Sequence, residues 1–246
     1  MKPAVDSMEK NVMRLFATVA LLLIPMFARA QDATIVADRP GLADGSATVG
    51  RGVAQLEIGL NADGGDEELF TLPTLIRYGF TDAFELRIES DVFGFNSDDS
   101  DVAPIAAGFK LRLKEGDLPL SLLASIQPPS GGGTLRSNAF EGGARLVSDI
   151  ALSDSLSLTP NVGVAFVEGG GTAAVFAASL ERDMGAVAPF VDFEATFDDG
   201  DASLIADAGI GWIVRPDTQL DISAGLNVTG HDYPDWFIGI GYSRRF

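Results

Sequence analysis

Apolar and polar residues alternate along most of the chain with a period of two, in segments of about ten residues. This period is typical of β-strands that have one apolar and one polar face. The contrast is sharpest where apolar and charged residues take turns: Phe84, Glu85, Leu86, Arg87, Ile88 and Glu89. We identify twelve such segments: 52–61, 69–78, 84–92, 102–113, 120–127, 139–148, 156–167, 173–182, 187–197, 203–214, 219–228 and 236–246.

The connections between these segments fall into two alternating sets. One set is turn-like: 79–83, 114–119, 151–155, 183–186 and 215–218. The other set is acidic or glycine-rich: 62–68, 94–101, 128–138, 168–172, 198–202 and 229–235. An even strand number is expected when both ends of a bacterial barrel lie on one side of the membrane. With a periplasmic N-terminus, the turn-like set faces the periplasm and the other set faces outside.

A soluble β-sandwich also alternates, because its two sheets enclose an apolar core about 10 Å thick. Soluble strands average about 5–6 residues, whereas strands that span a membrane need about 9–11. The segments match the longer figure, which predicts an all-β fold, a transmembrane antiparallel up-and-down β-barrel of about 12 strands over residues 51–246. The sandwich remains the alternative.

The two ends of the chain carry patterns of an export signal and of a barrel-assembly signal. Basic residues precede an apolar run at 15–27, and Ala28-Arg29-Ala30 resembles a cleavage site, which predicts a cleaved signal peptide over residues 1–30. The apolar run is short for a spanning helix, which needs about 20 residues. Residues 31–50 then form an N-terminal segment that either rests in the periplasm or plugs the lumen. The last strand alternates and ends on Phe246, the pattern that the bacterial barrel-assembly machinery reads.

The charged residues on the polar face of each segment are expected to line the lumen, because Arg or Lys placed in the lipid costs about 2–4 kcal/mol. The early segments hold every basic residue of this set, and the later segments are acidic. We therefore expect a salt-bridge network in the early half, including an Arg77–Glu85 pair, and an acidic path in the late half that favours cations or neutral solutes. The pore-lining candidates are Glu57, Arg77, Glu85, Arg87, Glu89, Lys110, Arg112, Arg145, Asp192, Glu194, Asp207 and Asp221.

Composition and motifs argue against several other functions. The net charge of -18 disfavours nucleic acid, and the absence of cysteine excludes disulfides and Cys-based metal or redox sites. No P-loop, GxSxG or zinc motif occurs. The one histidine, His231, lies in a predicted external loop with no serine in a nucleophile context nearby. We expect no catalytic residue, no metal site and no cofactor, although acidic loops such as 63–68, 98–101 and 198–201 leave divalent-ion bridging to lipopolysaccharide open.

Several strings resemble a family of outer-membrane transporters labelled for the MetA-type pathway of phenol degradation. The resemblance covers about residues 38–112 and rests on these strings: Asp38-Arg39-Pro40, Gln55-Leu56-Glu57, Leu72-Pro73, Arg77-Tyr78-Gly79, Thr81-Asp82 and Glu85-Leu86-Arg87. It implies export, a barrel fold and passage of aromatic or other small organic compounds. It assigns no functional residue.

The sequence thus predicts an outer-membrane barrel acting as a passive channel or transporter for small organic or polar solutes. The alternative is a closed structural or surface-interaction barrel, since twelve strands fall between the packed eight-stranded and the open sixteen-stranded barrels. A third reading is a lipid-modifying outer-membrane enzyme that uses His231. The expected partners are outer-membrane lipid and lipopolysaccharide, the barrel-assembly machinery and a small-molecule solute, with no nucleic acid.

Overall fold

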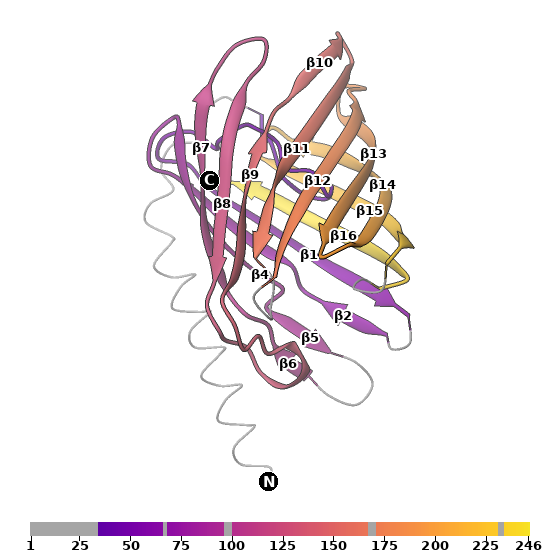
Figure 1. Ribbon diagram of the computed structural model, residues 1–246. Coiled ribbons are helices and arrows are strands. Elements are labelled where there is room, and N and C mark those ends of the chain that lie inside the picture. Colours follow the sequence, from indigo (N-terminus) through magenta and orange to yellow (C-terminus); the bar gives the residue numbers. More distant parts are fainter. Residues whose placement is uncertain (1–33, 66–67, 96–99, 167–170, 231–233) are drawn as a thin grey trace.

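A computed structural model describes residues 34–65, 68–95, 100–166, 171–230 and 234–246. They form an antiparallel, closed barrel of 12 strands (Figure 1). The predicted signal peptide at residues 1–30 lies outside the described residues, as do His231 and parts of the acidic loops. Among the described residues, no helix has the length and apolar character needed to cross a membrane.

Several of the twelve spans consist of two shorter strands. The strands of the early half are β1 (Ala54–Gly64), β2 (Leu69–Thr71), β3 (Thr74–Gly79), β4 (Phe84–Ser90), β5 (Phe93–Phe95), β6 (Ser100–Val102), β7 (Ala106–Lys114), β8 (Leu120–Gln127) and β9 (Glu141–Val147), with the short 3₁₀ helix η2 (Gly133–Leu135). Those of the late half are β10 (Ile150–Ser153), β11 (Leu156–Phe166), β12 (Thr172–Arg182), β13 (Val187–Asp198), β14 (Asp201–Arg215), β15 (Thr218–Thr229) and β16 (Trp236–Arg245).

The segments 69–78, 84–92 and 102–113 were predicted as continuous strands, and this detail is wrong. Pro73 has no N–H to donate and separates β2 from β3. Val92 has a φ of 51° and separates β4 from β5, so it does not continue the outward row of Leu86 and Ile88. The predicted turn 151–155 is also too long, because β10 continues pairing with β11 through a bulge.

The barrel closes where its first strand meets its last. β1 and β16 pair antiparallel from Gln55 opposite Arg245 to Gly64 opposite Trp236. All other spans pair with their neighbours in chain order. This pairing closes the wall into a barrel, which overturns the sandwich alternative.

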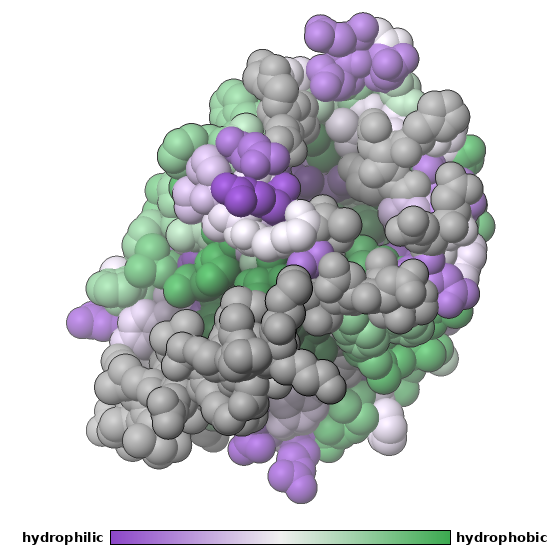
Figure 2. Space-filling model, turned by 90° about the horizontal axis from the view of Figure 1, so that it is seen from below, coloured by the Kyte–Doolittle hydropathy of each residue, from purple (hydrophilic) through white to green (hydrophobic). Residues whose placement is uncertain are grey.

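The two faces of the wall differ in the sense opposite to that of a soluble domain. Outward apolar side chains are exposed, for example Ile222 at 51% and Ile240 at 53%. Inward polar side chains are buried, and both Arg77 and Lys110 are 0% exposed. Figure 2, which views the molecule from the end of the β5–β6 loop, shows hydrophobic residues around much of the outer wall and hydrophilic residues at the rim.

The described part of the N-terminal segment, residues 34–50, lies inside the barrel at the end of the turn-like connections (Figure 1, indigo). The segment enters beside the β14–β15 turn, where the N–H of Ile35 donates to the carbonyl of Pro216 at 2.7 Å. It leaves beside the β3–β4 turn, where the hydroxyl of Thr48 donates to the carbonyl of Asp82 at 2.6 Å. Ile35, Ala43 and Val49 are buried.

Candidate functional site: the barrel lumen

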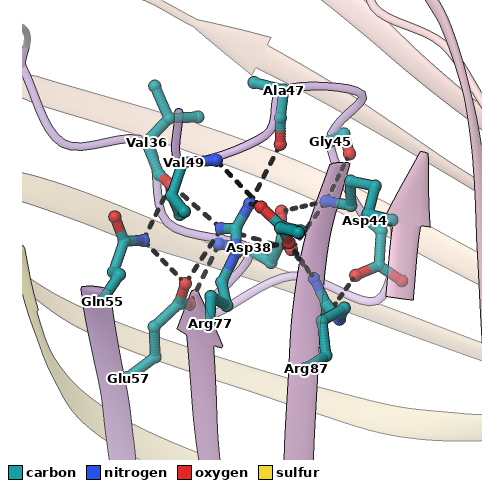
Figure 3. A network of polar contacts seen from close by, with 12 residues as sticks. Val36, Asp38, Asp44, Gly45, Ala47, Val49, Gln55, Glu57, Arg77 and Arg87 are labelled. Atoms are coloured by element: carbon teal, nitrogen blue, oxygen red, sulfur yellow. Dashed lines mark hydrogen bonds and ion pairs between the residues drawn. The ribbon is translucent and has the colours of Figure 1, made fainter. Parts of the chain in front are cut away.

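Arg77 is the centre of a buried ionic network on the inner face of β1, β3 and β4 (Figure 3). Its Nε and Nη2 donate to the two carboxylate oxygens of Glu85 at 2.9 and 3.1 Å, and its Nη1 donates to Glu57 at 3.1 Å. The predicted Arg77–Glu85 pair is therefore confirmed. The two-point contact fixes the guanidinium plane, which makes this pair stronger and more directional than a single ion pair.

The wall by itself leaves this network short of negative charge. Three buried cations, Arg77, Arg87 and Lys110, face two buried carboxylates, Glu57 and Glu85. An uncompensated buried charge costs several kcal/mol, so the early half needs further anions.

Asp38 of the N-terminal segment supplies one of them. Its carboxylate accepts Lys110 Nζ at 2.8 and 3.0 Å, lies 3.3 Å from Arg77 Nη1 and also accepts Arg87 Nη1. Burial by itself raises the pKa of the Asp38 carboxyl, but the charges of Arg77, Lys110 and Arg87 outweigh burial and hold this pKa well below its ordinary value. Asp38 is therefore ionised at neutral pH and locks the segment to the wall.

A second carboxylate of the segment, Asp44, extends the network. Asp44 Oδ1 lies 3.2 Å from Arg87 Nη2, and its side chain is 20% exposed. The backbone N–H of Asp44 donates to Asn161 Oδ1 at 2.9 Å, and Asn161 returns a hydrogen bond to the Asp44 carbonyl at 2.9 Å.

The rest of the segment follows the inner circumference of the barrel. The N–H of Leu42 donates to Asp192 on β13 at 2.8 Å, and that of Val49 donates to Glu85 on β4 at 2.8 Å. Arg39 reaches the opposite wall, where its Nη2 lies 3.4 Å from Asp221 on β15. Wall side chains thus replace the strand pairing that these backbone groups lack.

All twelve predicted pore-lining residues lie on the inner parity of their strands. Arg145 and Glu194 form an ion pair of 2.8 Å between β9 and β13, so Arg145 compensates one carboxylate of the late half and does not join the early network. Arg112 lies near the turn end, where it pairs with Glu115 at 2.8 Å. Glu89 is half-buried. The remaining eight are at most 7% exposed: Glu57, Arg77, Glu85, Arg87, Lys110, Asp192, Asp207 and Asp221.

The N-terminal segment leaves cavities on both of its sides. One of about 430 Å³ is lined by acidic and amide side chains that include Glu89, Gln127 and Glu141. Another of about 220 Å³ lies between the segment and the late half, beside Asp149 and Asp192. Arg39 lines both cavities.

The described residues hold no group of three or more His, Asp or Glu side chains arranged to bind a metal ion. The hydrolase reading depends on His231, which lies outside the described ranges.

The sequence pattern does not reveal the part that Asp38 and Asp44 take in the lumen. Residues 34–50 carry no alternation, so nothing in their own sequence shows which wall they contact. The available signal was the excess of Arg and Lys over carboxylates among the inward residues of β3, β4 and β7. The alternation of apolar and polar residues also does not reveal two inward aromatic residues on the late half, Phe190 and Phe237.

Solved structures of outer-membrane barrels share this fold. A crystal structure of an outer membrane channel from Pseudomonas putida F1 aligns with a TM-score of 0.58 and 14% identity, over 89% of this chain and 100% of that one. The KdgM porin aligns at 0.55 with 13% identity, over 77% of this chain and 99% of its own. The NanC porin aligns at 0.56 with 9% identity, over 77% and 98%.

No curated protein matches the sequence at a significant level. A family model does match, and it covers residues 37–246, which is far more than the strings near the N-terminus that first suggested it. The chain belongs to this family, whose description reads "Putative MetA-pathway of phenol degradation".

Proposed function

We propose that this protein is a passive channel of the outer membrane for small solutes and that it favours cations and neutral molecules over anions. The observation that carries the proposal is the closed wall with an apolar outer face and a charged inner face that borders cavities. Such a wall places its outer side chains in hydrocarbon and its inner ones in a polar lumen. The similar folds of known channels and porins support transport over catalysis.

The charge of the lumen supports the solute class. Asp192, Asp207 and Asp221 line the inner face of the late half, where Arg39 contacts Asp221 and Arg145 pairs with Glu194, so carboxylates remain in excess. A lumen lined with carboxylates raises the local concentration of cations and repels anions. The KdgM porin has been solved in complex with oligogalacturonate, a polyanion. The acidic lumen of the present chain suits a different ligand, and the family description points to neutral aromatic compounds.

Reversal potentials in planar bilayers test the charge preference. Under a KCl gradient we expect a potential of the sign that cation permeation produces. Asp207→Asn with Asp221→Asn should move it toward zero, because two lumen charges are removed. The matched control is Asp154→Asn, which removes a charge from the exposed β10–β11 turn and should change nothing. Anion preference in the wild type would overturn the proposal.

A closed structural barrel is the second candidate, and the contacts of residues 34–50 favour it. These residues bond to both halves of the wall and occupy lumen space. Liposome swelling separates the two candidates. A channel admits the neutral glycosides methyl glucoside and arbutin (a phenolic glucoside), tested side by side, whereas a closed barrel admits neither. Faster entry of arbutin would support an aromatic solute.

A further inference from the structure

Two carboxylates face each other on the late half without a cation between them. Asp192 on β13 and Asp207 on β14 are directly opposite in the strand register. Their side chains belong to residues that are 4% and 6% exposed. Asp192 accepts the N–H of Leu42 at 2.8 Å. Both oxygens of Asp207 are buried and have no hydrogen-bond partner among the described residues.

This arrangement is costly unless a cation joins it or one carboxyl takes up a proton. Two adjacent anions repel each other, and burial strengthens the repulsion because the local dielectric constant is low. The basic side chains that contact the late half pair with other carboxylates, since Arg39 contacts Asp221 at 3.4 Å and Arg145 contacts Glu194 at 2.8 Å. The unpaired carboxylate oxygens therefore offer acceptors to a cation from outside the protein.

Two aromatic rings border the same place. The ring of Phe237 and the Cβ of Asp207 both adjoin Gly225, at 2.3 and 2.7 Å from where a Cβ on that glycine would lie. The ring of Phe190 covers Gly209, two residues beyond Asp207 on β14. Both glycines leave room for the rings because they have no side chain. An aromatic face attracts a cation and also packs against an apolar group.

The Asp192 side of the site borders a cavity in the lumen. Asp192 and Phe190 line this cavity of about 220 Å³, together with the polar side chains of Ser157, Thr159 and Ser179. This volume suits a small molecule, below the usual 300–1,000 Å³ of drug-sized pockets.

We propose that Asp192, Asp207, Phe190 and Phe237 form a binding subsite for a small organic ammonium ion. An ammonium group offers three N–H donors, which match the free carboxylate oxygens, while its apolar part packs against the rings. A metal ion fits less well, because the described residues hold no cluster of three ligating side chains. The inference deepens the proposed function and rests on it for any role in transport, but binding itself does not require a conducting pore.

Isothermal titration calorimetry on the detergent-solubilised protein tests the subsite. The probe is benzylammonium, which is charged at neutral pH, and benzyl alcohol is its neutral match. We expect saturable binding of benzylammonium at one site and no measurable binding of the alcohol. Asp207→Asn should weaken benzylammonium binding at least tenfold. The control Asp198→Asn, near the rim on the same inner parity, should leave it within twofold.

Three results would overturn the subsite: equal affinity of the Asp207→Asn variant, equal binding of benzyl alcohol, or displacement of benzylammonium by equimolar sodium. Circular dichroism and heat-modifiable migration establish that each variant is folded. Should Asp207→Asn fail to fold, Asp192→Asn takes its place with the same expected loss. A wild-type protein that binds benzylammonium but does not conduct refutes the channel alone, and one that conducts cations but binds no benzylammonium refutes the subsite alone.

Discussion

Replacing Asp38 by asparagine removes the carboxylate that joins the N-terminal segment to the early half. Lys110, which is 0% exposed, then loses the one carboxylate that it contacts among the described residues, at 2.8 Å. Arg77 keeps Glu57 and Glu85, and Arg87 keeps Glu85 and Asp44. The substitution therefore leaves Lys110, and not Arg77 or Arg87, without a carboxylate contact.

The cost follows from the burial of that charge. Breaking a buried ion pair by removing one partner costs about 3–5 kcal/mol. The asparagine oxygen still accepts one hydrogen bond, so we take the lower end. A change of about 3 kcal/mol corresponds to a population ratio on the order of a hundredfold. Residues 34–50 take no part in the strand ladder. We therefore expect the substitution to release the segment from the wall while the barrel stays folded.

Cysteine labelling measures this release. The chain contains no cysteine, so Ala43→Cys introduces one thiol at a position that is 8% exposed. We expect a water-soluble maleimide to label this thiol about a hundredfold faster in the Asp38→Asn background, because reaction follows the released fraction. The matched control is Asp44→Asn, in the same segment, whose side chain is 20% exposed and whose partner Arg87 retains Asp38.

Release of the segment is refuted if Asp38→Asn changes the labelling rate no more than Asp44→Asn does. It is refuted equally if the variant unfolds as a whole, since that would show that the segment and the wall form one cooperative unit.

Further predictions concern pH, selectivity and the outer face. Because the pKa of Asp38 is depressed, its stabilising charge is present above the ordinary aspartate range near pH 4 and is lost only as the pH falls below that range. Hydrogen-exchange protection of the segment, corrected for intrinsic rates, should therefore be equal at pH 7.5 and 4.5. A loss of protection by pH 4.5 would contradict this. Glu194→Gln leaves Arg145 unpaired in the lumen and should lower the cation preference in bilayers, whereas unchanged selectivity would place Arg145 outside the ion path. Ile222→Arg puts a charge on an outward position that is 51% exposed and should lower the free energy of unfolding in liposomes by about 2–4 kcal/mol. The control, Asp183→Arg in the β12–β13 turn, should lower it little. Equal stability of the two variants would mean that Ile222 does not face lipid.

The alternation of apolar and polar residues along each strand could be predicted from the sequence because it is local. The alternation of Leu86 and Ile88 with Glu85 and Arg87 needs only the geometry of one extended strand, in which successive side chains point to opposite faces. The breaks at Pro73 and Val92 were not predicted. They occur where single backbone positions interrupt the ladder within segments whose hydrophobic pattern continues on both sides.

The candidate site was readable in part. Inward charges were assigned by parity, which placed Asp192 and Asp207 on the polar face. Their direct opposition, however, depends on the register between β13 and β14, and the aromatic neighbours depend on packing over glycines in the next strands. Neither follows from the pattern of a single strand.

The sequence by itself determined the barrel, its inner and outer faces and the uneven distribution of lumen charge, because each depends on a period of two that every strand carries within itself. Only the tertiary structure decided how residues 34–50 lie. Their position is set by contacts between residues far apart in the chain, such as Asp38 with Lys110 and Leu42 with Asp192. Closure of the barrel brings those charges together, and the balance of charge inside a closed wall then selects where the segment binds.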